Sequence, residues 1–398
     1  MTEKPLSGVK VLELGQLMAG PFAGTLLAYF GADVIKVEPP GRGDAVRGWR
    51  AITGDTSLWW YSLGRNKRSI TVNLKSDEGR RIVRRLAGEV DVLIENFRPG
   101  TLEKWGLGPD ELQGVNPGLI IARVSGYGQD GPYSSRPGYA SVCEGVGGLR
   151  YVNGFPGQPP VRQNLSLGDS LTGLHTAFGI LLSLFHRDRQ AVGTGQVVDV
   201  GIYEAVYNMM EAVVPEYDRL GMVRGPSGTT ITGVVPTNTY PCSDDKYVII
   251  GGNGDSIFKR LMNAAGRPDM AGDPKLTDNA GRLKHQERVD GAIADWTRTL
   301  TAAEVLEILE EVRVPAGLIY SVVDMVNDPH FQARGLFEVV DAGGEPLTLP
   351  AIIPKLSKTP GKTEWAGPKV GEHTRQVLGE VLGLSDDELD TLSVEGVI

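Results

Sequence analysis

Short apolar runs alternate with helical patterns through the first half of the chain. The spacing of apolar positions predicts strands over residues 9–14, 32–37, 69–74, 90–94 and 119–124, and helices over residues 23–30 and 76–87. β-branched strands that alternate with helices are typical of a mostly parallel sheet covered on both faces. The pattern therefore predicts an α/β fold.

The second half of the chain divides into three parts. The first is expected to contain a long apolar helix over 168–187, a strand over 196–200 and an Ala- and Met-rich helix to about residue 214. Two stretches lack periodicity, and turn residues interrupt both: 223–237 and 341–371. The residues between them predict a smaller α+β unit, with a strand over 247–250 and helices around 256–265, 285–298 and 301–312. A helix over 375–382 is expected near the end.

The charge balance argues against large polyanionic partners. The 398 residues include 40 Lys and Arg and 49 Asp and Glu, a formal net charge of −9. This charge disfavours nucleic acid or an anionic membrane surface as a partner. Residues 36–104 nevertheless hold 14 Lys and Arg against 9 Asp and Glu. That segment is either a solvated basic face or the footprint of a phosphate-bearing ligand.

Cysteine and histidine usage indicates a reduced compartment and no metal centre. Cys143 and Cys242 are the two cysteines, and the five histidines are scattered, so no spacing typical of metal ligands occurs. We expect a soluble, cytoplasmic protein without a permanently bound cofactor. The longest apolar helix candidate, 171–185, is shorter than the ~20 residues that a membrane span needs.

Two segments carry candidate chemistry. Residues 126–131 match the GxGxxG pattern after a strand, but Pro132 and Pro137 follow. No helix can begin there to receive a pyrophosphate, which argues against nicotinamide binding. Asp169 opens the long apolar helix. It is either a helix cap or a covalent nucleophile towards a reactive acyl group, because a helix N-terminus suits both roles.

Several segments in order along the chain resemble the class III coenzyme A transferases, the family of formyl-CoA:oxalate and carnitine CoA-transferases. The matching segments are Ala19–Ala23, Gly31–Glu38, Arg65–Ile70, Glu95–Gly100, Gly126–Pro132, Gly193–Gln196 and Gly371–Thr374. They span nearly the whole chain.

The resemblance implies a Rossmann-like large domain, a small α+β domain and an interlocked homodimer. On this basis we expect the first part of the large, CoA-binding domain at residues 1–200 and a linker at 201–230. The small domain then takes residues 231–325, and residues 326–398 form a return linker and the rest of the large domain.

The resemblance also implies the chemistry. The family nucleophile, an Asp in a Gly-Asp segment that opens an apolar helix, matches Asp169. It attacks the donor thioester, and the reaction passes through aspartyl anhydrides and an aspartyl-CoA thioester. Acyl-CoA and a carboxylic acid are the substrates, so CoA is a co-substrate.

The family's CoA-contact positions match five segments of this sequence. Leu17 and Met18 are expected near the thioester. The remaining matches are Val72, Asn73, Leu74, Lys75, Asn96, Phe97, Arg98, Lys104, Arg136, Pro137, Gly138, Tyr139 and Ala140. The cations among them could neutralise phosphates.

Departures from the family pattern narrow the function. Tyr139 stands where acyl-CoA racemases of this superfamily carry a catalytic His, and Met18 stands where the oxalate enzymes carry Gln. Arg47, with Trp49 and Trp59 nearby, is a candidate for binding a second substrate carboxylate. We therefore expect CoA transfer from an acyl-CoA such as succinyl-CoA to a dicarboxylate or hydroxy acid. A racemase and a non-catalytic CoA-binding subunit remain the alternatives.

Overall fold

The computed structural model describes residues 4–189 and 193–398, and the chain divides into two compact units. Unit 1 consists of Met1–Leu149, Gln163–Glu211 and Gln332–Ile398, and unit 2 consists of Arg150–Arg162 and Ala212–Phe331. Residues 150–162, expected within the large domain, thus group with unit 2. The expected linker at 201–230 is divided between the units after Glu211.

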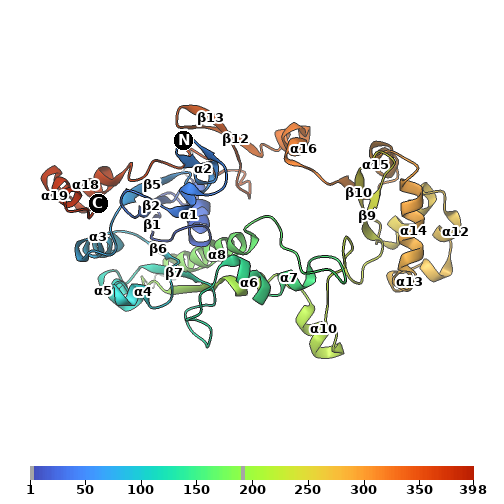
Figure 1. Ribbon diagram of the computed structural model, residues 1–398, viewed down its shortest axis with the longest axis horizontal. Helices are drawn as coiled ribbons and strands as arrows, with labels where there is room; N and C mark the ends of the chain where they lie inside the picture. Colours follow the sequence, from blue (N-terminus) through green and yellow to red (C-terminus); the bar gives the residue numbers. More distant parts are fainter. Residues whose placement is uncertain (1–3, 190–192) are drawn as a thin grey trace. The chain divides into compact units, whose positions relative to one another are not determined.

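A six-stranded parallel sheet forms the centre of unit 1 (Figure 1), which confirms the predicted α/β fold. Its strands, in spatial order, are β5 (Lys67–Thr71), β2 (Asp33–Glu38), β1 (Lys10–Glu13), β6 (Val92–Glu95), β7 (Ile120–Ser125) and β8 (Val197–Gly201). Every neighbouring pair is parallel. The strand order reverses between β1 and β6, and ligands of open α/β sheets bind at the carboxyl ends of strands beside such a reversal.

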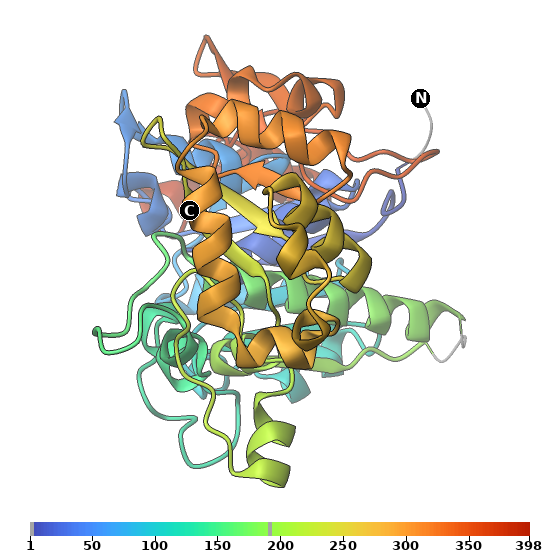
Figure 2. The same cartoon turned by 90° about the vertical axis from the view of Figure 1, so that its right-hand side faces the viewer.

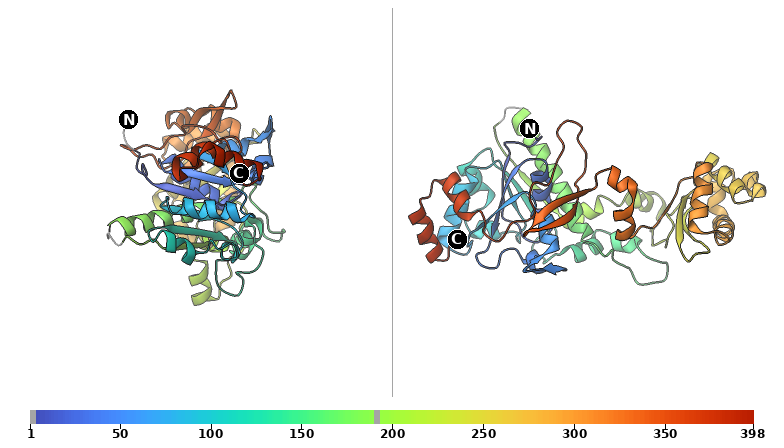
Figure 3. Two further views of the ribbon diagram at one scale, coloured as in Figure 1. Left: turned by 90° about the vertical axis from the view of Figure 1, so that its left-hand side faces the viewer. Right: turned by 90° about the horizontal axis from the view of Figure 1, so that it is seen from above.

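Alternating side chains give the sheet two apolar faces. Val11 packs on one face, where α1 (Ala19–Tyr29) and α8 (Leu167–Arg189) lie. Leu12 packs on the other face. That face is covered by α3 (Asp77–Ala87), α4 (Thr101–Lys104), α5 (Pro109–Val115), α18 (Thr374–Leu382) and α19 (Asp386–Val394). The right-hand view in Figure 3 shows the sheet between these two helical layers.

Two expectations from periodicity were wrong. The helix expected to run to about residue 214 ends early, because α9 (Ile202–Tyr207) and α10 (Val213–Leu220) are separate and Glu211 has a left-handed φ of 49°. Part of the non-periodic stretch 341–371 is a hairpin of β12 (Phe337–Ala342) and β13 (Glu345–Pro350). Its turn residues Gly343 and Gly344 both have positive φ, as a two-residue hairpin turn requires.

Unit 2 is a small α+β layer structure. Its antiparallel sheet has the order β11 (Ala316–Leu318), β10 (Tyr247–Gly251) and β9 (Thr237–Pro241). Its main helices are α11 (Asp255–Ala264), α12 (Pro268–Ala271), α13 (Asn279–Lys284), α14 (Gln286–Thr297) and α15 (Ala302–Glu311). The sheet buries Val248 and Ile250 against helical residues such as Leu261 and Ile293. In Figure 2 these helices, gold to orange, lie in front of the yellow strands.

Shorter elements complete the chain. They are β3 (Ile52–Thr53), β4 (Thr56–Ser57), α2 (Leu58–Leu63), α6 (Ala140–Val146), α7 (Leu149–Val152), α16 (Val322–Asn327), α17 (Pro329–Ala333) and the 3-10 turns Ala45–Gly48 and Pro274–Leu276. Within the described residues, every helix is too short or too polar to cross a bilayer.

Candidate active site

The loop after β1 is held in a defined conformation at the strand-order reversal. Asn96, which follows β6, accepts a hydrogen bond from the backbone N–H of Gln16 at 2.8 Å and donates one to the Gln16 carbonyl at 2.7 Å. Leu17 has a φ of 66°, a conformation that costs a non-glycine residue about 1–2 kcal/mol. Its N–H donates to both carboxylate oxygens of Asp44, at 3.0 and 3.1 Å. Asp44 and Asn96 therefore fix the backbone of this loop.

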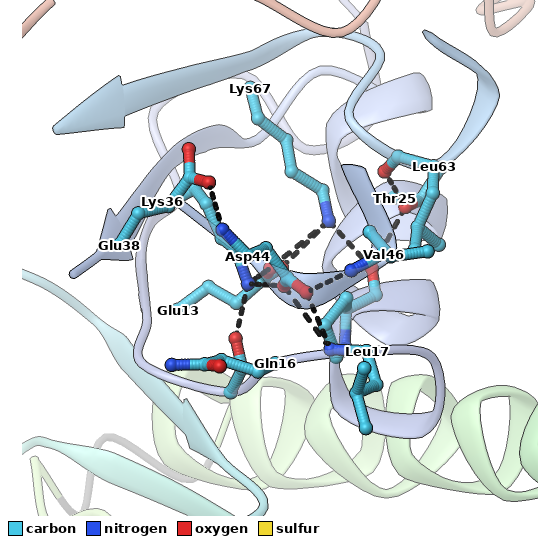
Figure 4. Close-up of polar contacts among 12 residues, drawn as sticks. Glu13, Gln16, Leu17, Thr25, Lys36, Glu38, Asp44, Val46, Leu63 and Lys67 are labelled. Carbon is cyan, nitrogen blue, oxygen red and sulfur yellow. Dashed lines mark hydrogen bonds and ion pairs between the residues drawn. The ribbon is translucent and has the colours of Figure 1, made fainter. Parts of the chain in front are cut away.

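A buried charge network lies beneath the loop (Figure 4). Lys36 contacts Asp44 at 2.8 Å and Glu13 at 3.2 Å, and it donates to the Gly15 carbonyl. Lys67 binds Glu13 at 2.9 Å and the Pro21 carbonyl at 2.7 Å. The side chains of all four charged residues are fully buried or nearly so. Removal of one partner would leave a buried charge uncompensated, which makes such networks sensitive to substitution.

The network sets the charge states of its members. Burial alone would lower the pKa of Lys36, but the charges of Asp44, Glu13 and Glu38 outweigh it and raise that pKa above its ordinary value. Burial would raise the pKa of Asp44, yet the charge of Lys36 and the hydrogen bonds to Asp44 lower it. Lys36 and Asp44 thus remain an ion pair through the neutral pH range.

Arg47 belongs to this buried network. Its guanidinium donates two hydrogen bonds to Glu38, at 2.7 and 2.6 Å, and a third to the Pro368 carbonyl at 2.9 Å. It also stacks 3.7 Å from the ring centroid of Trp60. We expected Arg47 to bind a substrate carboxylate, but the carboxylate that it binds in this structure is that of Glu38. Arg47 is therefore assigned a structural role.

Asp169 lies in the first turn of α8, and close packing fixes that turn. The Gly168 N–H donates to Glu144 Oε1 at 3.2 Å, and a Cβ at Gly168 would lie 3.0 Å from the Glu144 side chain. One turn further along, a Cβ at Gly173 would lie 2.8 Å from the carbonyl oxygen of Ala19. The two glycines therefore permit α8 to approach both α6 and the start of α1.

This packing places the first two turns of α8 beside the start of α1. Gly173 packs against Ala19, the first residue of α1. Asp169 precedes Gly173 by four residues and therefore lies about 6 Å closer to the N-terminus of α8 along the helix axis. Helix N-termini carry N–H groups without intrahelical partners and a partial positive charge. Asp169 thus occupies a region suited to anions and to developing negative charge.

The neighbouring Cys143 stays protonated. Burial, together with the charges of Asp169 and Glu144, raises the pKa of the Cys143 thiol to about 11. The thiol donates to the Gly126 carbonyl at 3.3 Å. Because the thiolate is the nucleophilic form, Cys143 is a poor nucleophile at neutral pH.

A cavity of about 410 Å³ adjoins the first turn of α8. It lies between α1, α2, α8 and the segment 350–353, and its walls are mostly apolar. Met18, Phe22, Trp59 and Leu171 contribute side chains to it, and Ser170, the neighbour of Asp169, lines it as well. Sequence analysis singled out Met18 and Trp59 but did not indicate this cavity.

Most of the expected CoA-contact residues follow the carboxyl ends of the parallel strands. Those after β5 begin with Val72, which is buried in the core, and Asn73, whose N–H donates to the Val397 carbonyl at 2.7 Å. Phe97, after β6, packs against Trp105 with 5.2 Å between ring centroids. Four cations of this set are exposed: Lys75, Arg98, Lys104 and Arg136.

The glycine-rich segment after β7 serves backbone packing. A Cβ at Gly126 would lie 2.8 Å from the Gly138 Cα, so the chain crosses itself closely there. Tyr139, which follows, is 70% exposed, whereas Ala140 is buried at the start of α6. This geometry agrees with the argument against a nicotinamide-binding turn. The described residues also contain no cluster of three or more His, Cys, Asp or Glu side chains that could hold a metal ion.

Sequence reasoning missed several residues of this site. Glu144, Asp44 and Lys36 act through partners that are remote in sequence, and no local spacing identifies them. Arg50 was missed as well, although it lies three residues after Arg47; it donates to Ser166, directly before α8, at 3.4 Å.

Comparisons with known proteins identify the family. The model of CoA-transferase family III matches residues 6–374. Succinyl-CoA--D-citramalate CoA-transferase of Chloroflexus aurantiacus is 47% identical over 397 residues, which cover 99% of this chain and 98% of that protein. The succinyl-CoA--L-malate CoA-transferase beta subunit of the same organism is 44% identical and covers 100% and 99%.

A solved structure of a related protein indicates the same family. The crystal structure of a CaiB/BaiF family protein from Brucella suis has a TM-score of 0.83 and 33% identity, and the match covers 95% of this chain and 100% of that one. The match with the family model and the matches with the relatives extend over nearly the whole chain, as the resemblance of its separate segments implied. The chain therefore belongs to CoA-transferase family III and is a class III CoA-transferase.

Proposed function

We propose that this enzyme transfers CoA from succinyl-CoA to a dicarboxylate or hydroxy acid, with Asp169 as the covalent nucleophile. The position of Asp169 in the first turn of α8, near the start of α1, is the observation that carries the assignment of the nucleophile. The names of the two Chloroflexus relatives support succinyl-CoA as donor and acids of the citramalate and malate type as acceptors.

The proposed reaction exchanges one thioester for another. The Asp169 carboxylate attacks the succinyl-CoA carbonyl and expels the CoA thiolate, which leaves an aspartyl–succinyl anhydride. The thiolate attacks the aspartyl carbonyl of that anhydride, forming aspartyl-CoA thioester and releasing succinate. The acceptor carboxylate then displaces CoA to form a second anhydride. The thiolate attacks the acceptor's acyl carbonyl, which yields the new acyl-CoA and restores Asp169.

Every step moves negative charge between a carboxylate, a tetrahedral oxyanion and a thiolate, and no proton needs to be transferred. The N-termini of α1 and α8 supply N–H donors and positive potential where this charge develops. The hydrogen bonds from Asn96 and to Asp44 hold Gln16 and Leu17 beside that position before substrate binds. Such preorganisation lowers the cost of stabilising the transition state.

We place CoA along the carboxyl edge of the sheet. Lys75, Arg98, Lys104 and Arg136 would contact its phosphates, because they are exposed cations on segments that follow β5, β6 and β7. Leu17 and Met18 would lie beside the thioester. The remaining expected contact residues, which are Val72 to Leu74, Asn96, Phe97 and Pro137 to Ala140, would form the walls.

A second copy of the chain is the proposed partner. Leu174, Phe178, Leu182 and Phe185 form an exposed apolar stripe along α8. Large exposed apolar surfaces of this kind mark interaction sites. This stripe supports the homodimer that we expect, and light scattering of wild type and Phe178→Asp would test it, since the charge should shift the mass towards the monomer. The interlocked arrangement and the cytoplasmic location remain predictions from the sequence.

A transfer assay tests the proposed function. Purified protein is incubated with succinyl-CoA and a panel of mono-, di- and hydroxycarboxylic acids, and new CoA esters are followed by mass spectrometry beside Asp169→Asn. We expect new esters with wild type alone, and the acid that forms them is the acceptor.

Other outcomes separate the alternatives. Unchanged succinyl-CoA with every acid would contradict the proposed donor. Deuterium uptake at the α-carbon of a branched acyl-CoA without any acceptor would favour the racemase. Binding of CoA without turnover of any donor would favour the non-catalytic subunit. Equal turnover by Asp169→Asn would exclude Asp169 as nucleophile.

A further inference from the structure

Arg50 occupies an unusual position beside the active-site helix. Its φ of 62° lies in the left-handed region, which costs a non-glycine residue about 1–2 kcal/mol. Its guanidinium carbon lies 3.9 Å from the ring centroid of Trp59, and Trp49 packs against the same indole at 6.4 Å. A strained backbone and a cation–π contact thus hold an exposed arginine in one place.

This place is close to the nucleophile. Arg50 donates a hydrogen bond to Ser166 Oγ at 3.4 Å. Ser166 directly precedes α8, and Asp169 follows three residues later, which puts their Cβ atoms about 5–6 Å apart. Arg50 thus contacts a residue about one helical turn from Asp169, a separation similar to the length of a four-carbon diacid whose two carboxyl groups would lie at Asp169 and Arg50. Trp59, on which Arg50 stacks, also lines the adjoining cavity.

The charge of Arg50 has no carboxylate partner among the described residues, where Ser166 is its only hydrogen-bond acceptor. Two neighbouring arginines differ in this respect. Arg47 binds Glu38, and buried Arg65 donates to the carbonyls of Ser62 and Pro350 at 2.7 Å. Arg50 therefore keeps its planar fork of donors available for a carboxylate from outside the chain.

We propose that Arg50 binds the carboxylate that does not react, in the succinyl group and in a dicarboxylic acceptor, and so determines the specificity for diacids. This inference rests on the proposed function. The guanidinium forms charge-assisted hydrogen bonds to that carboxylate, and the indole of Trp59 fixes its orientation. Arg50 contributes to binding in the ground state and in the transition state alike, because the remote carboxylate keeps its charge throughout the reaction.

The test compares succinyl-CoA with butyryl-CoA, which has the same acyl length but lacks the second carboxylate. Kinetics are measured for wild type, Arg50→Gln, Arg50→Lys and the control Arg298→Gln. Arg298 is an exposed arginine of unit 2 whose ion-pair partner is the nearby Asp295.

In Arg50→Gln we expect KM for succinyl-CoA to rise roughly 10- to 100-fold, with kcat nearly unchanged. Kinetics with butyryl-CoA and the affinity for free CoA stay at wild-type values. For Arg50→Lys we expect a KM for succinyl-CoA between those of wild type and Arg50→Gln, because lysine keeps the positive charge and loses the planar arrangement of donors. Arg298→Gln matches wild type.

Two results would overturn the inference. One is an Arg50→Gln enzyme that retains the full preference for succinyl-CoA. The other is an equal loss with both donors, which would indicate a structural role. In either case the proposed function stands, whereas a wild-type enzyme inactive with succinyl-CoA refutes the proposed function itself. Should Arg50→Gln fail to fold, Arg50→Lys decides by the same criterion: a reduced preference supports the inference, and an unchanged one overturns it.

Discussion

Two arginine–tryptophan pairs, with arginines three residues apart and adjacent tryptophans, have opposite environments. Arg47 stacks on Trp60 inside the protein and binds Glu38 through two hydrogen bonds. Arg50 stacks on Trp59 at the surface and reaches Ser166, directly before α8. The same kind of side-chain pair thus supports the fold in one case and, in our proposal, binds substrate in the other. Burial and the presence of a carboxylate partner decide which role an arginine takes.

The largest expected difference between the pairs is in stability. Arg47→Gln leaves the buried Glu38 carboxylate without its arginine, and breaking a buried pair typically costs 3–5 kcal/mol, so we expect a loss of about 3–5 kcal/mol in the free energy of unfolding. Arg50→Gln should lose at most about 1 kcal/mol, because Arg50 is exposed. Urea denaturation of both variants measures the difference. Equal losses would mean that the two arginines do not divide their roles in this way.

The two tryptophans should show a smaller difference in stability, again with the larger loss at the buried residue. Trp60 is fully buried and donates from Nε1 to the Pro368 carbonyl at 2.9 Å, so Trp60→Leu should cost about 2–4 kcal/mol. Trp59→Leu should cost about 1 kcal/mol and should instead raise KM for succinyl-CoA, since Arg50 loses its support. Thermal unfolding and steady-state kinetics of the two variants test this pair. A Trp59→Leu enzyme with the wild-type KM for succinyl-CoA would show that Trp59 does not contribute to substrate binding.

The last expected effect concerns the pH dependence of stability at Glu95, a buried carboxylate paired with Arg123. Burial raises the pKa of Glu95 to about 7, although hydrogen bonds from Arg123 and the Phe97 N–H oppose this. The folded state therefore holds a proton that the unfolded state has already lost between about pH 4.5 and 7. Stability should fall as the pH rises through this window and level off above it. In Glu95→Gln the urea midpoint should change less with pH in this window. An unchanged slope would show that other groups cause the pH dependence.

The sequence predicted those features that depend on local patterns. Apolar strands alternating with helices predicted the parallel sheet. The helix start at Asp169 left a helix cap and a nucleophile open, and the family resemblance indicated the nucleophile. The hairpin over 337–350 was missed because Pro and Gly hid its alternation, although the Gly343–Gly344 turn was a usable signal. Arg47 was named as a candidate for carboxylate binding and Arg50 was not, because sequence does not show which arginine is buried and already paired. Glu38 is the last residue of β2, nine residues before Arg47, and Ser166 is 116 residues away from Arg50.

The central claim is that Asp169 carries the transferred group. The most direct test mixes the enzyme with succinyl-CoA alone, traps the protein adduct with hydroxylamine after rapid mixing, and maps the modified residue by peptide mass spectrometry. The account predicts a hydroxamate at Asp169, its absence from Asp169→Asn, and no such adduct without CoA ester. Turnover without any adduct, or a hydroxamate at a different residue, would contradict it.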